Sequence, residues 1–388
     1  MQEENVSAVV LAAGEGRRLE PLTNRRPKPM VPVSNRPILE YVVSAIADAG
    51  LERIVLVVGY QQERIRNYFG DGDDWGIDIE YVVQENQLGT AHAIAQAESA
   101  VTGSFLVLNG DRLVEASLVE QVRDEVGTSD GPVMAVTRSD HASDYGVVSM
   151  DGERVTEISE KPREPITSEV INAGVYGFDE SVFDAIRATP TEGGELAITA
   201  TLERIAEKRS IRAVRYRGLW QDVSHLWDLL EINAAVIDEV DEDDSTLHHD
   251  AVASDTAIGD DVTLGRNATI GGGTAIGDNV TIEANAVLSN AVVFSDAVIE
   301  AGAVVRDAIV AGNARIGANA TIAGGSTTVV VEGEVHEDVD LGGVVGDNAT
   351  VGSGVTAAPG TVVGDGATVD HGVSVDGRIE PDAIVRRG

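Results

Sequence analysis

The residues best suited to hold a phosphate chain lie close to the N-terminus. A hydrophobic run passes through Leu11 into Gly14 and Gly16, and Arg18 is followed ten residues later by Lys28. Glycines let backbone N–H groups approach a phosphate, and Arg and Lys neutralise its charge. The loop lacks both the Gly-Lys-Ser/Thr of a Walker A motif and the third glycine of a dinucleotide fingerprint. On these residues alone, we predict only an anion-binding loop.

Further short motifs follow along the chain in a defined order. They are Gln84–Ala93 (QENQLGTAHA), Leu108–Asp111 (LNGD), Tyr145-Gly146, Glu160-Lys161-Pro162, Asn172–Gly174 (NAG) and Trp220–Asp222 (WQD). Each is weak alone. Together with the N-terminal loop they closely resemble the signature of the sugar-nucleotide pyrophosphorylases, the nucleotidyltransferases that make NDP-sugars. The resemblance covers about residues 5–235.

This resemblance implies roles for individual residues. Asp111 and Asp222 would bind Mg²⁺, the implied cofactor, against the α-phosphate of a nucleoside triphosphate. Arg18 and Lys28 would stabilise the departing pyrophosphate, and Lys161 would hold the sugar phosphate. Catalysis would therefore depend mostly on positioning and electrostatics.

The resemblance also implies a substrate-binding set. In it, Gln84 and Gly89 would read a pyrimidine base, and Glu160 and Asn172 would bind the sugar hydroxyls. The whole set is Leu11, Ala12, Ala13, Gly14, Gln84, Gly89, Thr90, Asp111, Gly146, Glu160, Lys161 and Asn172.

Composition helps to separate functional from ordinary residues. The chain has only three lysines, and two of them, Lys28 and Lys161, fall inside these motifs. Lys208 lies in a helical pattern and is predicted to face solvent. Three histidines are predicted to be surface or hydrogen-bonded residues rather than metal ligands: His92, His141 and His225.

An α/β domain must position these motifs. Hydrophobic runs at 6–11, 54–58 and 105–108 are typical of buried parallel strands, and helical patterns at 37–49 and 90–99 separate them. Alternating strands and helices predict a Rossmann-like, mostly parallel mixed sheet. We expect this nucleotidyltransferase domain to cover residues 1–237, followed by an acidic linker at 238–250.

The remaining residues, 251–388, form a hexapeptide repeat. Apolar residues recur every six positions in three blocks, and an interruption covers about 323–344. The predicted inward positions are Val252, Ile258, Leu264, Ile270, Ile276, Ile282, Leu288 and Phe294; then Val298, Val304, Val310, Ile316 and Ile322; then Val345, Val351, Ala357, Val363, Val369 and Val375. This period predicts a parallel β-helix of about six coils. Family resemblance adds a left-handed coil and trimer formation.

The composition excludes several functional classes. With 28 Lys+Arg against 65 Asp+Glu, the formal charge is −37, which argues against a nucleic-acid surface. No apolar run is long enough to span a membrane, and no cysteine is present. We therefore expect a cytoplasmic protein. An acidic, lysine-poor composition is also typical of extreme halophiles, whose molar salt screens self-repulsion.

The expected activity is transfer of a nucleotidyl group from dTTP or UTP to a sugar-1-phosphate. The sequence does not choose between these nucleotides, nor between glucose-1-phosphate and its N-acetylamino analogue. Arg17 stands where the family commonly has threonine, which makes the nucleotide harder to infer. Two alternatives remain: a bifunctional enzyme whose β-helix also acetylates glucosamine-1-phosphate, as the archaeal two-domain architecture would allow, or a non-catalytic regulatory subunit.

Overall fold

The structure, a computed structural model, describes residues 6–139, 141–160, 168–191, 193–239, 252–253 and 255–387. Its contacts divide the chain into two compact units. The first unit comprises Met1–Glu15, Pro27–Met30 and Ile38–Asp222, and the second comprises Gly16–Arg26, Val31–Pro37 and Val223–Gly388. Two short N-terminal segments therefore belong to the same unit as the C-terminal repeat.

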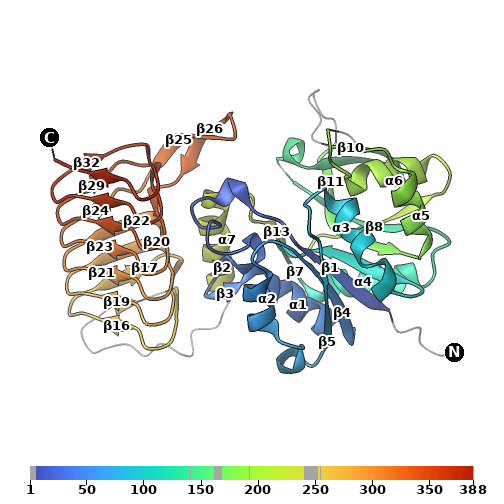
Figure 1. The fold of residues 1–388 in the computed structure, drawn as a ribbon, viewed down its shortest axis with the longest axis horizontal. Coiled ribbons are helices and arrows are strands. Elements are labelled where there is room, and N and C mark those ends of the chain that lie inside the picture. Colours follow the sequence, from blue (N-terminus) through green and yellow to red (C-terminus); the bar gives the residue numbers. More distant parts are fainter. Residues whose placement is uncertain are drawn as a thin grey trace. The chain divides into compact units, whose positions relative to one another are not determined.

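A nine-stranded sheet forms the centre of the first unit, in the order β5-β4-β1-β6-β11-β8-β12-β10-β9 (Figure 1). The strands β5, β4, β1 and β6 run parallel, whereas β11 is antiparallel to both β6 and β8. The expected parallel arrangement thus holds for one half of the sheet, and the hairpin β9–β10 makes the other half mixed. The strands are β1 Ser7–Ala12, β4 Arg53–Val58, β5 Asp78–Val83, β6 Phe105–Asn109, β8 Val133–Arg138, β9 Gly146–Asp151, β10 Arg154–Glu160, β11 Val170–Phe178 and β12 Ile211–Arg215.

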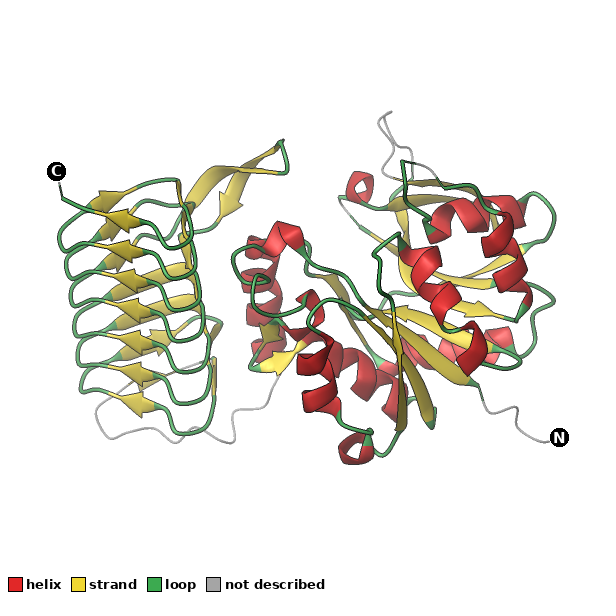
Figure 2. Ribbon diagram, in the orientation of Figure 1, coloured by secondary structure: helices red, strands yellow, loops and turns green. Residues whose placement is uncertain are grey.

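Helices cover both faces of this sheet (Figure 2). Side chains alternate along β1: Val10 packs with α1, α2 and α4, whereas Val9 packs with α3, α5 and α6. Burial on both faces explains why the strands are continuous hydrophobic runs. The helices are α1 Ile38–Asp48, α2 Gln62–Phe69, α3 Thr90–Gln96, α4 Ala116–Val126, α5 Ser181–Ala188 and α6 Ile198–Ala206.

A two-stranded ladder brings distant motifs together beside the sheet. It pairs β7 (Arg112–Val114) with β13 (Trp220–Asp222) in antiparallel register. In that register Asp222 lies opposite Arg112, the residue that follows Asp111.

The second unit contains a β-helix with three faces of parallel strands (Figure 1). One face is a seven-stranded sheet, and the other two belong to a branched twelve-stranded sheet. Asn and Asp residues in the left-handed region turn many corners. Its strands are β14 Val252–Ala253, β15 Thr256–Ile258, β16 Thr263–Leu264, β17 Thr269–Gly271, β18 Thr274–Ile276, β19 Thr281–Ile282, β20 Val287–Val293, β21 Val298–Ile299, β22 Val304–Val310, β23 Arg315–Ile316, β24 Thr321–Ile322, β27 Gly343–Val345, β28 Thr350–Val351, β29 Thr356–Ala357, β30 Thr361–Val363, β31 Thr368–Val369, β32 Ser374–Val375, β33 Arg378–Ile379 and β34 Ile384–Val385.

The predicted repeat register is wrong at four positions. The interior column begins at Ala253, which pairs with Ile270, and later contains Val293, Ile299 and Val305, rather than the neighbouring residues Val252, Phe294, Val298 and Val304. The step from Leu288 to Val293 has five residues, because Ala275 pairs with Val292 only 17 positions later. Both members of each pair are apolar, so periodicity alone could not choose between them. The shift leaves Phe294 buried outside the column.

The interruption in the repeat is an antiparallel hairpin of β25 (Ser326–Val331) and β26 (Glu334–Asp340). In the same unit, β2 (Pro32–Val33), β3 (Arg36–Pro37) and helix α7 (Leu226–Glu239) associate with the β-helix through buried Asn233. Its side chain accepts from the Ser34 amide at 2.9 Å and donates to the Gly273 carbonyl at 2.7 Å. Most of the predicted acidic linker lies outside the described residues. Among those that are described, no helix is long and apolar enough to cross a membrane.

Candidate active site

Two carboxylates and a lysine meet at the carboxyl end of β6. Asp111 follows that strand, and Asp222 ends β13. The Lys28 ammonium lies 2.5 Å from Asp111 Oδ2 and 3.8 Å from Asp222 Oδ1. Lys28 and Asp222 are both buried. The structure thus brings together three of the four predicted catalytic residues.

Arg112 completes this cluster and was missed by the sequence analysis. Its Nη1 lies 2.7 Å from Asp222 Oδ2, and its guanidinium lies 4.9 Å from the ring centre of Trp220 and 5.6 Å from that of Tyr145. The aromatic residues of two predicted motifs therefore enclose this arginine. In a chain whose cations are mostly arginine, composition could not single out Arg112, and only the β7–β13 register reveals its partner.

The opposite charges of this cluster stabilise one another. Burial alone would raise the pKa of Asp111, but Lys28 and Arg112 outweigh that effect and lower it to about 2. Burial likewise opposes the charge of Arg112, whereas Asp222 and Asp111 raise its pKa. The Asp111 carboxylate is therefore ionised at neutral pH, and it lies beside the side chains of Lys28 and Arg112.

A cavity of about 190 Å³ adjoins these charges. Seven residues of the predicted substrate-binding set line it: Leu11, Ala13, Gly14, Gln84, Gly89, Thr90 and Asp111. Lys28, Pro29, Gln87, Ala93 and Asn109 complete the lining. Ala12 instead belongs to the hydrophobic core, because its side chain faces the other side of β1.

Gln84 is held in place by a histidine. It is buried, and its Nε2 lies 2.9 Å from His92 Nδ1 and 3.4 Å from the Gly89 carbonyl. His92 is therefore a hydrogen-bonded residue, as predicted, and it fixes the amide expected to read a base.

The predicted sugar-binding residues gather on neighbouring strands. Gly146 pairs with Glu160 across β9 and β10, and a Cβ at position 146 would lie 3.6 Å from Asn172 Cβ. The Asn172 amide donates to the Tyr176 hydroxyl at 2.7 Å. Burial raises the pKa of Tyr176 to about 12, although the Asn172 hydrogen bond opposes the shift. Tyr176 therefore stays protonated and orients Asn172.

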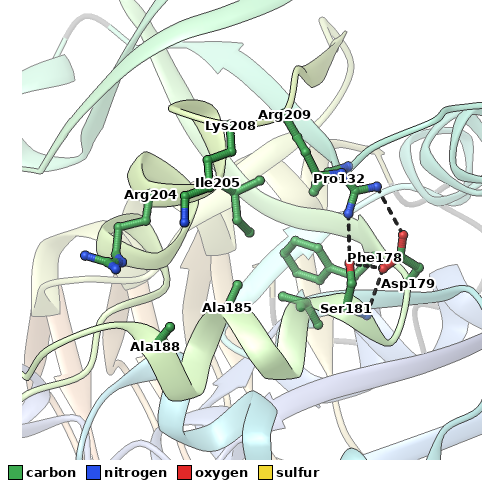
Figure 3. A pocket seen from close by; sticks show the side chains of 11 residues that line it. Pro132, Phe178, Asp179, Ser181, Ala185, Ala188, Arg204, Ile205, Lys208 and Arg209 are labelled. Atoms are coloured by element: carbon green, nitrogen blue, oxygen red, sulfur yellow. Dashed lines mark hydrogen bonds and ion pairs between the residues drawn. The ribbon is translucent and has the colours of Figure 1, made fainter.

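The remaining predicted residues have other positions. Arg18 lies in the short 3₁₀ helix Arg17–Leu19 of the second unit, and Lys161 lies outside the described residues. Lys208 is exposed, as expected. It lines a separate cavity of about 200 Å³ beside α5 and α6, where Arg209 contacts Ser181 and Asp179 (Figure 3). Of the predicted substrate-binding residues that the structure describes, none lines that second cavity.

Glycine at position 14 offers a direct test of the first cavity. A Cβ there would meet no protein atom within 4 Å, so the fold itself leaves room for alanine. We expect Gly14→Ala to change the melting temperature by less than about 2 °C, yet to lower kcat/KM for the nucleotide at least about tenfold, or roughly 1.4 kcal/mol. The added methyl would occupy space that a bound phosphate chain needs.

A matched variant distinguishes this effect from a general response to alanine. Gly127 follows α4, is exposed, and would place a Cβ no closer than 3.9 Å to another atom. Steady-state kinetics should show Gly127→Ala unchanged. If kcat/KM of Gly14→Ala were equally unchanged, the Gly14 loop would not be part of the nucleotide site.

Two known protein families match separate parts of this chain. Residues 7–239 match the nucleotidyl transferase family, and the chain belongs to it. Residues 252–383 match the family described as the GMPPB C-terminal domain.

Particular relatives share the first of these regions. A Methanococcus maripaludis protein named bifunctional protein GlmU is 38% identical over 238 residues, which are 61% of this chain and 55% of that protein. The Haloferax volcanii low-salt glycan biosynthesis nucleotidyltransferase Agl11 is 35% identical over 239 residues, covering 60% of this chain and 67% of the relative. The chain therefore spans about half the length of its Methanococcus relatives.

Solved structures share the fold. A Bacillus anthracis protein crystallised with sucrose, provisionally assigned as a glucose-1-phosphate thymidylyltransferase, superposes with a TM-score of 0.56 at 25% identity. The match covers 63% of this chain and 98% of that one. A UDP-glucose pyrophosphorylase bound to UDP-glucose shares the fold with a TM-score of 0.55 at 23% identity, covering 61% and 99% of the two chains.

Proposed function

We propose that this protein transfers a nucleotidyl group from dTTP or UTP to a sugar-1-phosphate, either glucose-1-phosphate or N-acetylglucosamine-1-phosphate. The products are an NDP-sugar and pyrophosphate. The observation that carries this proposal is the cluster of Lys28, Arg112 and two carboxylates beside a cavity lined by the Gly14 loop and Gln84. The names of the relatives agree with such a reaction.

The chemistry requires no proton transfer. An ionised oxygen of the sugar phosphate bonds to the α-phosphorus, and the bond from that phosphorus to the bridging oxygen breaks as pyrophosphate leaves. Lys28 and Arg18 would stabilise the leaving group, and Lys161 would hold the sugar phosphate. Gln84 would orient the base, while Glu160 and Asn172, in the group with Gly146, would orient the sugar.

The carboxylates suit a divalent cation. Asp111 and Asp222 converge on one ammonium, so their oxygens reach a common position. Mg²⁺ prefers such oxygen ligands and is often bound by one or two carboxylates together with substrate phosphates. When bound there it would supply positive charge to the reacting phosphates. Among the described residues no group of three or more acidic or histidine side chains is placed to hold a metal.

We propose a structural role for the β-helix, with a left-handed coil, trimer formation and no acetyltransferase activity. Resembling bifunctional enzymes place a histidine as general base on a late coil, and 300–308 contains none. His336 lies on the hairpin, where it packs 4.8 Å from the His225 ring and 5.1 Å from Trp227. Those packing contacts support a structural role for His336.

A screen for pyrophosphate release tests the proposed reaction. Each of the four nucleotides UTP, dTTP, ATP and GTP is combined with several sugar phosphates, with Mg²⁺ and molar KCl present. Release that requires both a pyrimidine nucleotide and a sugar-1-phosphate would support the proposal. Absence of release from every pair would contradict it.

Lysine is expected to be required at position 28. Lys28 lies between Pro27 and Pro29, is buried, and contacts both carboxylates. Arginine would keep the charge but place a larger planar group in the same space. We expect Lys28→Arg to lower kcat at least about tenfold, or roughly 1.4 kcal/mol in the barrier. Arg53→Lys, at an exposed ion pair on β4, is the reciprocal control and should leave kcat unchanged. Normal turnover by Lys28→Arg would show that position 28 needs only a positive charge.

A further inference from the structure

Segment 16–26, which is part of the predicted anion-binding loop, is braced by its own hydrogen bonds. In segment 16–26, the Thr23 hydroxyl and the Leu19 amide both donate to the Gly16 carbonyl, each at 2.9 Å. Leu19, Leu22 and Thr23 are buried. These contacts tie Thr23 to Gly16 and so close the segment around Arg18.

Two aspartates of the β-helix hold the C-terminal end of that loop. Arg26 Nη2 donates to both carboxylate oxygens of Asp347, at 2.8 and 3.1 Å. The Asn24 amide donates to Asp365 Oδ2 at 2.9 Å. Asp365 also positions Asp347, the partner of Arg26, since its Oδ1 accepts the Asp347 backbone N–H at 2.8 Å.

The coil is shaped to receive Arg26. Its guanidinium carbon lies 4.5 Å from the ring centre of Phe294, the residue that the five-residue step leaves outside the interior column. A Cβ at Gly312 would approach Asp347 Oδ1 to 3.1 Å. An irregular coil step and a glycine thus accommodate one arginine from the N-terminal loop.

Burial distinguishes these aspartates from the other acids. Of the 65 Asp and Glu residues, the structure describes only three as buried: Asp222, Asp347 and Asp365. One belongs to the candidate active site, and both others bind the loop. Burying a carboxylate is costly unless a partner compensates it, so these positions are unlike the solvated acidic surface.

We propose that Asp347 and Asp365 are positioning residues for nucleotidyl transfer, which makes the β-helix the anchor of the phosphate-binding loop. The inference rests on the proposed function. Segment 16–26 begins two residues after Gly14 and ends two residues before Lys28, and both of those residues line the cavity. Anchoring the segment limits the conformations in which Arg18 and Lys28 are presented. Loss of the anchor lowers the binding-competent fraction, and apparent nucleotide affinity falls by the same factor.

Three full-length variants test this role: Arg26→Gln, Asp347→Asn and the double variant. We expect each single change to lower kcat/KM for the nucleotide at least about tenfold at a temperature where the variant stays folded, although breaking a buried ion pair also lowers its melting temperature. Amide hydrogen exchange in 16–26 should accelerate without substrate. The double variant should be no worse than either single variant, since both remove the same contact.

Arg315→Gln is the matched control. Arg315 is exposed and pairs with Glu300 elsewhere on the β-helix, so its loss should change neither kinetics nor loop exchange. Unchanged kinetics in Arg26→Gln and Asp347→Asn of an active enzyme would overturn the positioning role alone, as would additive losses in the double variant. An inactive wild type would overturn the proposed function, and the positioning role with it.

Discussion

Replacing Asp111 with asparagine is expected to reduce kcat at least about 100-fold, or roughly 2.7 kcal/mol in the barrier, with a smaller loss of stability than the one expected for Asp222→Asn. The amide would keep the size of the side chain but lose one of the two charges proposed to hold Mg²⁺. Asp111 is partly exposed, and its loss leaves Asp222 to compensate Arg112. Single-turnover kinetics over a Mg²⁺ series measure the effect.

Asp222→Asn is expected to cause a similar loss of turnover together with a lower melting temperature. Asp222 is buried 2.7 Å from Arg112 Nη1, and removing one partner of a buried ion pair typically costs about 3–5 kcal/mol. Asp124→Asn, at an exposed pair with Arg123, is the control and should alter neither property. Near-normal turnover of both active-site variants at limiting Mg²⁺ would place the metal elsewhere.

The depressed pKa of Asp111 adds a pH criterion. Because its folded pKa of about 2 lies below the ordinary value of 3.8, ionisation of Asp111 stabilises the fold above about pH 4. This contribution is lost as the pH falls towards 2. Asp111 therefore stays ionised from pH 5 to 9, and any inflection of activity in that range must come from another group. Comparing acid unfolding of the wild type and Asp111→Asn isolates the contribution.

Low salt is expected to unfold or inactivate the protein, which would support the proposed halophilic adaptation. Its formal charge is −37, and nearly all the acidic side chains that the structure describes are half-buried or exposed. The Debye length grows from about 3 Å at 1 M salt to about 10 Å at 0.1 M, so repulsion among these carboxylates increases on dilution. We expect both helical circular dichroism and activity to fall below a few hundred millimolar KCl.

A neutral osmolyte separates charge screening from general stabilisation. Sucrose strengthens burial without screening charge, so at low salt it should restore the fold only partly, whereas KCl should restore it fully. A melting temperature that stays flat from 0.1 to 2 M KCl would reject the halophilic adaptation.

Local patterns were sufficient for much of the architecture. The strands around Val9, Val55 and Val107 were predictable because each is buried on both faces and therefore reads as a continuous hydrophobic run. The hexapeptide period predicted the β-helix because each coil must place aliphatic side chains inward. Motif order likewise singled out Lys28, Asp111 and Asp222, whose side chains lie together in the structure.

Tertiary structure decided which charges pair. Arg112 is recognisable only once β7 lies beside β13, since sequence order does not reveal the residue opposite Asp222. The inward choice of Val293 over Phe294 depends on pairing with the preceding coil, because both side chains are equally suited to burial. That choice leaves Phe294 free of the column and in contact with Arg26, which lies near the other end of the chain. Hydrophobic period is a local property, whereas ion pairing depends on strand register and on contacts between distant segments.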